Sequence, residues 1–433
     1  MPSVALYTLG CKVSQYESEA IAELFLEGGF RVVDSGCVAD AYVINTCTVT
    51  AESDRKSRQV IRRLRSKNES AVIAVIGCYS QRSPEEIERL PVDIIIGTEN
   101  KLSVVDLVIE ALARKERTQS VSVTDLSSAC FEPMTIKSAP RTRAYVKIED
   151  GCEAKCTYCA ISAARGPVRS KPKDEVISEV EGLAKSGVRE IVLTGIETGS
   201  YGRDFNTGYG LADLICELDS RGSAERIRLG SLAPELVGRE FADRIRGVGI
   251  LTPHFHLSMQ SGSDSVLQRM KRRYNRAMAL RNIEALRDAA PGACFTTDLM
   301  VGFPGETEED FLDTIDFVRR ARFIACHVFA YSRRAGTPAA DYPDQIPESV
   351  KRERSAELIR VSHEVRDEVL AERVVSGEPL RCILETYSDG MYTSHSDEFI
   401  EVCCEADIGR EGEIVLVRPL KSKGGVIYGE IIE

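Results

Sequence analysis

The sequence predicts an α/β protein with an N-terminal parallel α/β sheet domain, a central partial (β/α)6 barrel and a small C-terminal antiparallel β-barrel. Three observations predict this fold class. Strand and helix patterns alternate from the N-terminus, six further strand–helix units follow a polar segment, and short strands split by Gly and Asp form the end. The 433 residues suffice for two to four domains. The expected boundaries are 1–115 for the first domain, 116–140 for a linker, 141–373 for the barrel and 374–433 for the last domain.

The first domain is expected to be a parallel sheet with helices on both faces. Its strands are apolar runs rich in Val, Ile and Ala, which is typical of strands buried on both sides. Helical patterns separate them, as parallel connections require. Strands are expected at 4–9, 42–46, 72–76 and 93–96, and helices at 14–27, 52–65 and 101–113.

The barrel and the last domain follow a polar linker that has no clear period and leaves room for one strand. Six strand–helix units predict an incomplete parallel barrel, in which chemistry lies at the carboxyl ends of the strands. The last domain has the strand lengths and turn residues of a barrel of OB-fold size. Barrel strands are expected at 145–148, 191–194, 227–230, 254–258, 295–300 and 325–330, a long charged helix at 348–373, and strands of the last domain at 380–385, 399–404 and 414–417.

Composition favours a cytoplasmic globular protein. Hydrophobic residues make up 43% and charged residues 28% of the chain, which is ordinary for a soluble protein. The sequence lacks a run of about 18 apolar residues that would predict a membrane span. Its start, MPSVALYTLG, lacks the basic and apolar regions of a signal peptide. The net charge of -11 argues weakly against a nucleic acid partner, but local basic clusters matter more than the sum.

The densest chemical signal is a C-x-x-x-C-x-x-C run just after the first barrel strand. It contains Cys152, Cys156 and Cys159, three of fourteen cysteines in the chain. In a reducing compartment such spacing indicates metal binding and not disulfides. Three thiolates can hold three irons of a 4Fe-4S cluster, and the fourth iron stays open because the next cysteine is Cys216. A zinc site is the alternative, although structural zinc prefers four protein ligands.

A second set of cysteines is dispersed in the first domain. Cys11, Cys47 and Cys78 each follow an expected strand, in the segments TLGCK, INTCT and VIGCY. The carboxyl ends of parallel strands share one edge of a sheet, so we expect the three thiols to converge there. The alternative is three unrelated core cysteines, which behave as small hydrophobic residues. The remaining cysteines receive no role, and the five histidines show no constellation.

With an aromatic residue before its last cysteine, the run at the head of six strand–helix units resembles the radical S-adenosylmethionine superfamily. Together, the two cysteine sets resemble the methylthiotransferase family over nearly the whole chain, including a C-terminal RNA-binding β-barrel of the TRAM kind. The start TLGCKVSQYE is most similar to the branch that acts on N6-threonylcarbamoyladenosine. The chain departs from the family at Ile161-Ser162-Ala163, where the family has Ile-Pro-aromatic. This departure concerns the shape of the cysteine loop and not its three ligands. The other segments that carry the resemblance are VINTCTVT, LSMQSGSDSVLQRMKRRY, DLMVGFPGETEEDF and YSRRAGTPAA.

The resemblance implies two 4Fe-4S clusters and S-adenosylmethionine as cofactors, with no catalytic residue beyond the cluster ligands. Cys152, Cys156 and Cys159 would hold the radical-generating cluster, and Cys11, Cys47 and Cys78 the auxiliary one. For Ser258, Gln260 and Asp298 there is an equal alternative, namely that each side chain is hydrogen-bonded within the barrel mouth and does not contact a ligand. The residues implied to contact S-adenosylmethionine are Tyr158, Gly195, Glu197, Ser258, Gln260 and Asp298.

The resemblance also implies the reaction and its partners. A 5'-deoxyadenosyl radical would remove hydrogen from C2 of an adenine, and a methylated sulfur held at the auxiliary cluster would join that carbon. The expected partners are the anticodon loop of tRNA, an electron donor such as flavodoxin or ferredoxin, and a sulfur donor. No membrane partner is expected.

Basic residues cluster locally in spite of the negative total. Arg55, Arg58, Arg62 and Arg65 fall on one stripe of an expected helix and predict contacts with RNA phosphates. The alternative for each cluster is a solvated helix face. Two further clusters follow the cysteine loop and the fourth barrel strand: Arg165, Arg169, Lys171 and Lys173, and Arg269, Lys271, Arg272 and Arg273.

Two other functions fit the same motifs. A methylthiotransferase of this architecture could modify isopentenyl-adenosine in tRNA or an aspartate of a ribosomal protein. Outside enzymes, the chain could be a zinc-stabilised RNA-binding protein without catalysis. The basic clusters favour RNA, whereas the nucleoside rests on the family resemblance alone.

Overall fold

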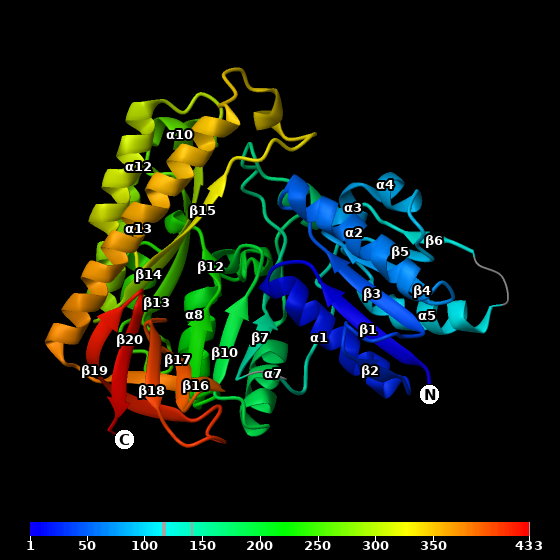
Figure 1. Ribbon diagram of the computed structural model, residues 1–433, viewed down its shortest axis with the longest axis horizontal. Helices are drawn as coiled ribbons and strands as arrows, with labels where there is room; N and C mark the ends of the chain where they lie inside the picture. Colours follow the sequence, from blue (N-terminus) through cyan, green and yellow to red (C-terminus); the bar gives the residue numbers. More distant parts are fainter. Residues whose placement is uncertain (115–117, 140–141, 433) are drawn as a thin grey trace.

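The computed structural model describes residues 1–114, 118–139 and 142–432 (Figure 1). Residues 116, 117 and 140 of the predicted linker and residue 433 of the predicted last domain lie outside the described residues. The N-terminal part is a six-stranded parallel sheet in the order β2-β1-β3-β4-β5-β6. Its strands are β1 (Ser3–Thr8), β2 (Arg31–Val33), β3 (Ala41–Thr46), β4 (Val72–Gly77), β5 (Ile94–Ile96) and β6 (Ser120–Ser122).

Helices cover both faces of this sheet, as predicted. Neighbouring residues of one strand enter separate cores: Val43 packs against α1 and α5, and Ile44 packs against α2 and α4. The three-residue edge strand β2 was not predicted, and β6 is a strand within the segment 116–140, which was expected to leave room for one. The helices are α1 (Lys12–Glu27), α2 (Ala51–Lys67), α3 (Cys78–Arg82), α4 (Pro84–Glu88) and α5 (Val104–Ala113), with a 3-10 turn η1 (Lys101–Ser103) before α5.

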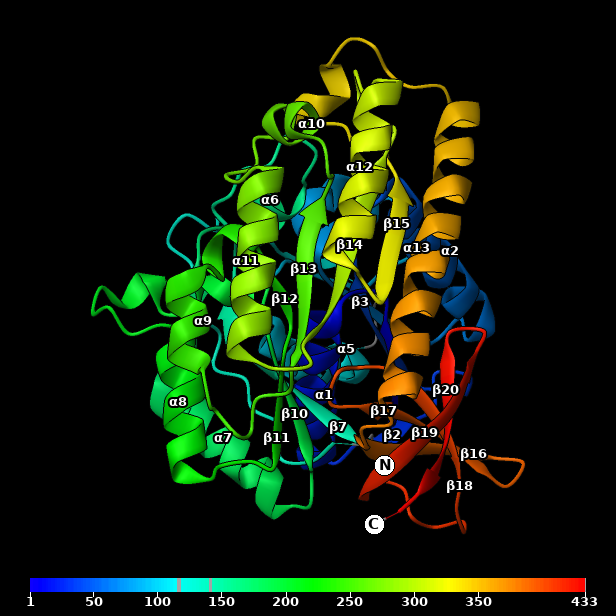
Figure 2. The same cartoon turned by 90° about the vertical axis from the view of Figure 1, so that its left-hand side faces the viewer.

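The central part confirms the predicted partial barrel (Figure 2). Its parallel strands follow one another in chain order, and the third strand is broken at Gly230 into β11 and β12, so that two sheets form the wall. Helices line the outside, and α1 of the first sheet packs against β7. The strands are β7 (Arg143–Lys147), β10 (Glu190–Thr194), β11 (Arg226–Leu229), β12 (Ser231–Leu232), β13 (His254–Gln260), β14 (Cys294–Val301) and β15 (Ala325–Ala330). The main outer helices are α7 (Lys173–Lys185), α8 (Leu211–Arg221), α9 (Arg239–Ile245), α11 (Arg276–Ala289), α12 (Glu308–Ala321) and α13 (Glu348–Ser376).

The inner wall of this barrel is polar. Along β13, Phe255 and Leu257 pack in the outer core, whereas His254 and His256 face inward and bond to Thr296. This division follows the two-residue period of a strand. The barrel therefore has a polar interior, called the hollow below, and its apolar core lies on the outer side of the strands. The inward side chains of the other strands include Arg143, Glu190, Arg226, Arg228 and Asp298.

The C-terminal part is a closed five-stranded barrel, again as predicted. One pair differs from the predicted antiparallel arrangement, because β18 and β20 run parallel and the barrel closes through them. In the part of the chain that the structure describes, no helix is both long and apolar enough to cross a membrane. The strands are β16 (Leu380–Ser388), β17 (Met391–Ser396), β18 (Glu401–Glu405), β19 (Ile414–Lys423) and β20 (Val426–Ile431).

A loop of the C-terminal barrel plugs the amino-terminal end of the central barrel. Phe399 stacks on His254 with ring centroids 4.8 Å apart, and the guanidinium of Arg228 lies 4.8 Å from the Phe399 ring. Arg226 donates to the carbonyl of Ser396 at 2.7 Å. This end of the barrel is therefore closed, and the opposite end, where the cysteine loops lie, stays available for chemistry.

Candidate active site

The loop that carries Cys152, Cys156 and Cys159 leaves the carboxyl end of β7 through the short strand β8 (Glu149–Asp150). Gly151 begins it with φ +91°, and a Cβ there would stand 1.9 Å from the carbonyl oxygen of Pro167, so only glycine fits. The Cys152 amide donates to Gly166 at 3.0 Å. These contacts fix the loop at the mouth of the barrel, where the sequence predicted it.

Cys156 is buried, and Cys152 and Cys159 are partly buried. The pKa of Cys152 is raised to about 12, chiefly by burial and in part by the charges of Glu197, Cys159 and Cys156. Burial also raises the pKa of Cys159, to whose sulfur the Ile161 amide donates at 3.3 Å. A metal that binds Cys152 and Cys159 therefore has to displace their protons. Ile161, Ser162 and Ala163, which depart from the family pattern, form the start of helix α6 (Ile161–Arg165).

A guanidinium stands directly beside this loop. Arg272 donates to the sulfur of Cys156 at 3.4 Å and to the carbonyl of Ser258 at 3.0 Å. A fixed positive charge at this point offsets the negative charge of a thiolate-ligated cluster. Arg272 belongs to a basic cluster that was predicted to contact RNA, so its position at Cys156 corrects that prediction.

Cys11, Cys47 and Cys78 converge at the carboxyl edge of the N-terminal sheet. Cys11 is the N-cap of α1, Cys47 follows β3, and Cys78 is the first residue of α3. Thr46 and Gly77 are in register as the last residues of β3 and β4, so the next residue of each strand is a cysteine. The pKa of Cys78 is raised to about 11, chiefly by burial, and the charges of Cys47 and Cys11 act on it as well.

Backbone geometry holds this second set in place. Gly77 has φ +99°, and a Cβ would stand 2.6 Å from Asn45 Oδ1 and 2.9 Å from the Thr46 carbonyl oxygen. The Asn45 amide donates to the Ser14 carbonyl at 3.0 Å and thus joins the strand end to α1. A glycine before Cys78 and a buried amide beside it keep the sheet edge in one conformation.

Arg165 connects the two cysteine sets. It lies on α6, a few residues after Cys159, and is fully buried. Its Nε donates to the sulfur of Cys78 at 3.1 Å, and its Nη1 pairs with Glu17 at 2.6 Å and Asp150 at 3.2 Å. Burial alone would raise the pKa of Glu17, but Arg165 and two lysines hold it below its usual range.

The prediction that Arg165, Arg169 and Lys171 contact phosphates is therefore wrong. All three are buried, and Lys171 pairs with Glu179 at 2.5 Å while Arg169 pairs with Asp150 at 3.3 Å. The segment 165–173 contains no acidic residue, and the counter-charges come from α1, β8 and α7. The contacts of these basic residues join the N-terminal sheet to the barrel.

The residues predicted to contact S-adenosylmethionine line the same mouth. Glu197 accepts from the Ala233 amide at 3.1 Å, and burial raises its pKa to about 7. Gly195 packs so closely that a Cβ would meet Glu149 Oε2 at 2.5 Å. Glu197 lies within electrostatic range of Cys152 and Arg272. Its position beside the cysteine loop suits a group that holds an amine.

The other predicted contacts are spread over β13, β14 and the cysteine loop. Ser258 and Gln260 are half-buried on β13, and Gln260 has a left-handed backbone with φ +63°. Asp298 pairs with His256 Nε2 at 3.3 Å. Tyr158 lies half-buried in a small apolar cluster with Phe303 and Tyr331.

The histidines gather in a way that the sequence did not predict. Ligand atoms of His256, Asp298 and His327 all lie within 4.8 Å of one another on the inner faces of β13, β14 and β15. His256 Nδ1 bonds to Thr296 at 2.9 Å, which fixes the ring. These residues are far apart in the sequence and meet only through strand pairing, so no spacing reveals them.

The four arginines predicted to bind RNA lie on α2 in different environments. Arg65 pairs with Asp93 at 2.6 Å and donates to backbone carbonyls, and it is nearly buried. Arg58 donates to the Tyr79 hydroxyl at 2.7 Å. Arg55 is exposed and pairs with Glu52. Arg62 is exposed, and within residues 1–114, 118–139 and 142–432 its side chain has no hydrogen bond or ion pair. Arg55, in an exposed ion pair, and Arg62 are the two members that remain accessible to a phosphate.

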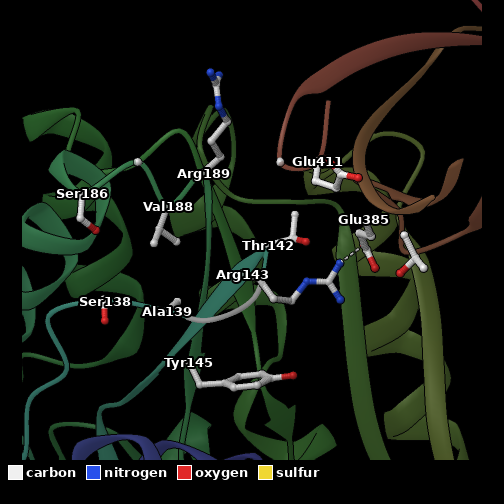
Figure 3. A pocket seen from close by; sticks show the side chains of 13 residues that line it. Ser138, Ala139, Thr142, Arg143, Tyr145, Ser186, Val188, Arg189, Glu385 and Glu411 are labelled. Carbon is white, nitrogen blue, oxygen red and sulfur yellow. Dashed lines mark hydrogen bonds and ion pairs between the residues drawn. The ribbon is translucent and has the colours of Figure 1, made fainter. Parts of the chain in front are cut away.

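A cavity of about 700 Å³ lies elsewhere, between the start of β7 and the C-terminal barrel (Figure 3). Arg143, Tyr145, Arg189, Glu385 and Glu411 line it, and Arg143 forms an ion pair with Glu385 across it. It opens at the plugged end of the central barrel, away from both cysteine sets. It is therefore not the place where the predicted cofactors would meet.

Comparisons with known proteins agree with this arrangement. The chain matches the Radical SAM superfamily over residues 146–318 and the uncharacterized protein family UPF0004 over residues 3–97. It is 41% identical to the threonylcarbamoyladenosine tRNA methylthiotransferase of Bacillus subtilis (99% of this chain, 96% of the relative). Its identity to the protein of the same name from Thermotoga maritima is 41% (82% and 80%). The tRNA-2-methylthio-N(6)-dimethylallyladenosine synthase of Acetivibrio thermocellus is 33% identical (99% and 90%).

Among solved structures, the fold is similar to that of a radical S-adenosylmethionine methyltransferase from Kitasatospora setae with cobalamin and a 4Fe-4S cluster bound. The TM-score is 0.57 at 16% sequence identity, and the match covers 78% of this chain and 77% of that chain. At this identity the likeness concerns the fold alone. It agrees with a sheet domain followed by a partial parallel barrel.

Proposed function

Because the chain belongs to the radical S-adenosylmethionine tRNA methylthiotransferase family, we propose that it attaches a methylthio group to C2 of N6-threonylcarbamoyladenosine beside the anticodon of tRNA. Full-length likeness to proteins named for this nucleoside supports the choice of substrate. The observation that carries the proposal is the buried link from Cys78 through Arg165 to the loop of Cys159. This link keeps the two thiol sets close to each other at the mouth of the barrel. A reaction that joins a carbon radical to a sulfur requires such proximity.

The barrel thiols fit a 4Fe-4S cluster by the chemistry of the donor set. Three thiols on one loop suit a negatively charged cluster, because an amide donates to one of them and the guanidinium of Arg272 donates to another. When bound, such a cluster supplies an open iron for S-adenosylmethionine and the electron that cleaves it. The chain would orient the cofactor, with Glu197 and Gly195 at its amine and Asp298 on the opposite strand, and exclude water from the radical.

The N-terminal thiols fit a second cluster for similar reasons. Cys11, Cys47 and Cys78 come from three separate strand ends, and Arg165 supplies the neighbouring positive charge. We propose that this second group holds the sulfur to be transferred. An electron donor such as flavodoxin or ferredoxin, a sulfur donor and a cytoplasmic location complete the proposal.

The proposed substrate must reach the hollow between the two thiol sets. A target adenine has to leave its stack, which a loop nucleotide does at lower free-energy cost than a paired one. The polar inner wall of β13 and β14 would receive a base with polar substituents. Exposed Arg55 and Arg62 on α2 would hold the RNA backbone.

Reversing the charge of Arg55 and Arg62 together should weaken tRNA binding. Each phosphate contact that is lost should reduce the slope of log affinity against log salt by about one unit. Filter binding of tRNA between low and physiological salt measures the slope. Arg239, an exposed arginine on α9, gives the matched control Arg239→Glu. An unchanged slope in the double variant would mean that α2 is only a solvated surface.

Affinity for S-adenosylmethionine should fall as the pH drops below about 7. The pKa of Glu197 is raised to about 7 by burial, so its carboxylate is ionised above that pH and protonated below it. Since only the carboxylate attracts an ammonium group, affinity should decline about tenfold per pH unit below that point. Equilibrium dialysis with the reconstituted enzyme measures this. Glu197→Gln should bind weakly at every pH, and a variant with the wild-type pH profile would exclude Glu197 from the amine site.

The direct test of the proposed function uses anaerobically reconstituted protein and tRNA. About eight irons per chain with acid-labile sulfide are expected, as two cubane clusters require. Incubation with S-adenosylmethionine, a reductant and tRNA that carries N6-threonylcarbamoyladenosine should give the 2-methylthio nucleoside in a mass spectrum of the digest. Zinc in place of iron would end the proposal. If only tRNA that carries dimethylallyl-adenosine gave a product, that nucleoside would replace N6-threonylcarbamoyladenosine as the proposed substrate.

A further inference from the structure

One lysine lies where the N-terminal sheet domain meets the barrel. Lys12 is the first residue of α1 and follows Cys11 directly. Helix α1 packs against β7, and its first turn faces the barrel strands in Figure 1. The charge of Lys12 interacts with those of Arg143, Glu190, Arg228 and Asp298, which lie on four different barrel strands. Its side chain is exposed to water. A side chain that faces the open hollow is expected to be near these charges and in contact with water at the same time.

Lys12 differs from the other cations of this hollow because it has no partner. Arg143 and Arg228 both pair with Glu190, at 2.9 and 3.1 Å. Asp298 already pairs with His256. For Lys12, no hydrogen bond or ion pair is found among the residues that the structure describes. The two guanidiniums repel it, and the two acids that attract it, Glu190 and Asp298, are already paired with other residues.

An anion would meet further favourable groups at this place. The first turn of α1 contains no acidic residue, and the Cys11 side chain caps none of its amides. The free amides of a helix start and its dipole favour negative charge. The lysine supplies a full charge at the same point. Together they form a receptor for a carboxylate at the junction of the two domains.

The place of Lys12 connects it to the proposed reaction. Its neighbour along the chain is Cys11 of the N-terminal thiol set. It also lies within electrostatic range of Asp298, one of the residues predicted to contact S-adenosylmethionine. An adenine that reacts between these two places would bring its N6 substituent near this part of the wall. Asp298 itself stands in a polar group with His256 and His327. Such polar surroundings suit a polar substituent better than a hydrocarbon, which offers them no hydrogen bond.

We infer that the Lys12 ammonium binds the threonine carboxylate of the N6-threonylcarbamoyl group and selects this nucleoside over adenosines with apolar N6 groups. The inference rests on the proposed function and deepens it. A threonylcarbamoyl group ends in a carboxylate that is ionised at neutral pH, whereas a dimethylallyl group is a hydrocarbon. Lys12 would act as a specificity residue and not in the chemical step.

The test pairs the lysine with the carboxylate in a double-mutant cycle. Wild type and Lys12→Met are assayed by mass spectrometry on anticodon stem-loop RNAs that carry N6-threonylcarbamoyladenosine or its threonine methyl ester. Wild type should prefer the acid by about 10- to 100-fold in kcat/KM, the range of a charge-assisted hydrogen bond. Lys12→Met should lower kcat/KM for the acid to the value for the ester and leave the ester unchanged. Lys12→Arg should keep part of the preference.

Two controls separate this inference from other failures. Lys137→Met makes the same chemical change at an exposed lysine that pairs with Glu27, and it should keep the wild-type preference. Iron content and 5'-deoxyadenosine formation without RNA show whether Lys12→Met disturbs the neighbouring thiol site. Equal losses on acid and ester, or no loss on either, would overturn the role of Lys12. A wild-type enzyme that is inactive on the acid RNA but active on dimethylallyl-adenosine RNA would overturn the proposed function instead.

Discussion

Replacing Cys156 with alanine is expected to abolish the reductive cleavage of S-adenosylmethionine. Cys156 is the buried member of the barrel set and lies 3.4 Å from the guanidinium of Arg272. With two thiols left on the loop and no further cysteine before Cys216, a cluster with a single open iron cannot form. The measurement is 5'-deoxyadenosine by liquid chromatography after reduction with dithionite.

A matched cysteine variant makes this test specific. Cys216 lies on α8, is partly exposed and donates to the Arg244 carbonyl at 3.4 Å. Cys216→Ala should therefore form 5'-deoxyadenosine at the wild-type rate. Because Cys156 is buried, circular dichroism must first show that the variant is folded. Normal 5'-deoxyadenosine from a folded Cys156→Ala variant would exclude this loop as the cofactor site.

Sequence patterns predicted the strands, helices and thiol sets because each depends on local order. The run of Cys152, Cys156 and Cys159 lies within a single loop, so its spacing already brings the thiols together. Cys11 and Cys78 required one further step, namely that parallel strands end at a common edge. Apolar runs on both faces of β3 and β4 made that step secure, since helices had to cover both sides.

The phosphate contacts predicted for Arg165, Arg169 and Lys171 are wrong because packing between separate elements buries these residues. The segment 165–173 contains no acidic residue, yet Glu17 and Glu179 reach Arg165 and Lys171 from α1 and α7. Arg65 likewise meets Asp93 from the sheet edge. A stripe of charge on a helix predicts a polar face but cannot reveal whether that face meets water, RNA or another domain.

The polar interior of the barrel was not predicted from the sequence. His256 and His327 are brought together by the pairing of β13, β14 and β15, and the plug of Phe399 arrives from a separate domain. The alternation of apolar and polar residues along β13 was available as a signal. It would have predicted a polar inner face, from which the histidines and Asp298 follow as neighbours.

Removing the N-terminal thiol set should separate radical formation from sulfur transfer. In the triple variant Cys11→Ala, Cys47→Ala and Cys78→Ser, the barrel loop keeps its own three thiols. It should still bind one 4Fe-4S cluster and form 5'-deoxyadenosine under strong reduction. Methylthio transfer to tRNA should be lost, because no group remains to hold the sulfur. Serine at position 78 keeps a hydrogen-bond acceptor for Arg165, which otherwise would lose its contact with Cys78.

The expected iron content falls from about eight to about four per chain, as one cubane cluster is lost. Cluster binding can contribute to folding, but the N-terminal sheet has an apolar core on each face that includes Ile21, Phe25, Ile61 and Leu64. Circular dichroism and gel filtration should therefore show a folded triple variant. Mass spectrometry of digested tRNA then gives the decisive measurement. A methylthio nucleoside produced by the folded variant would mean that Cys11, Cys47 and Cys78 are only core residues, and that the transferred sulfur is held elsewhere.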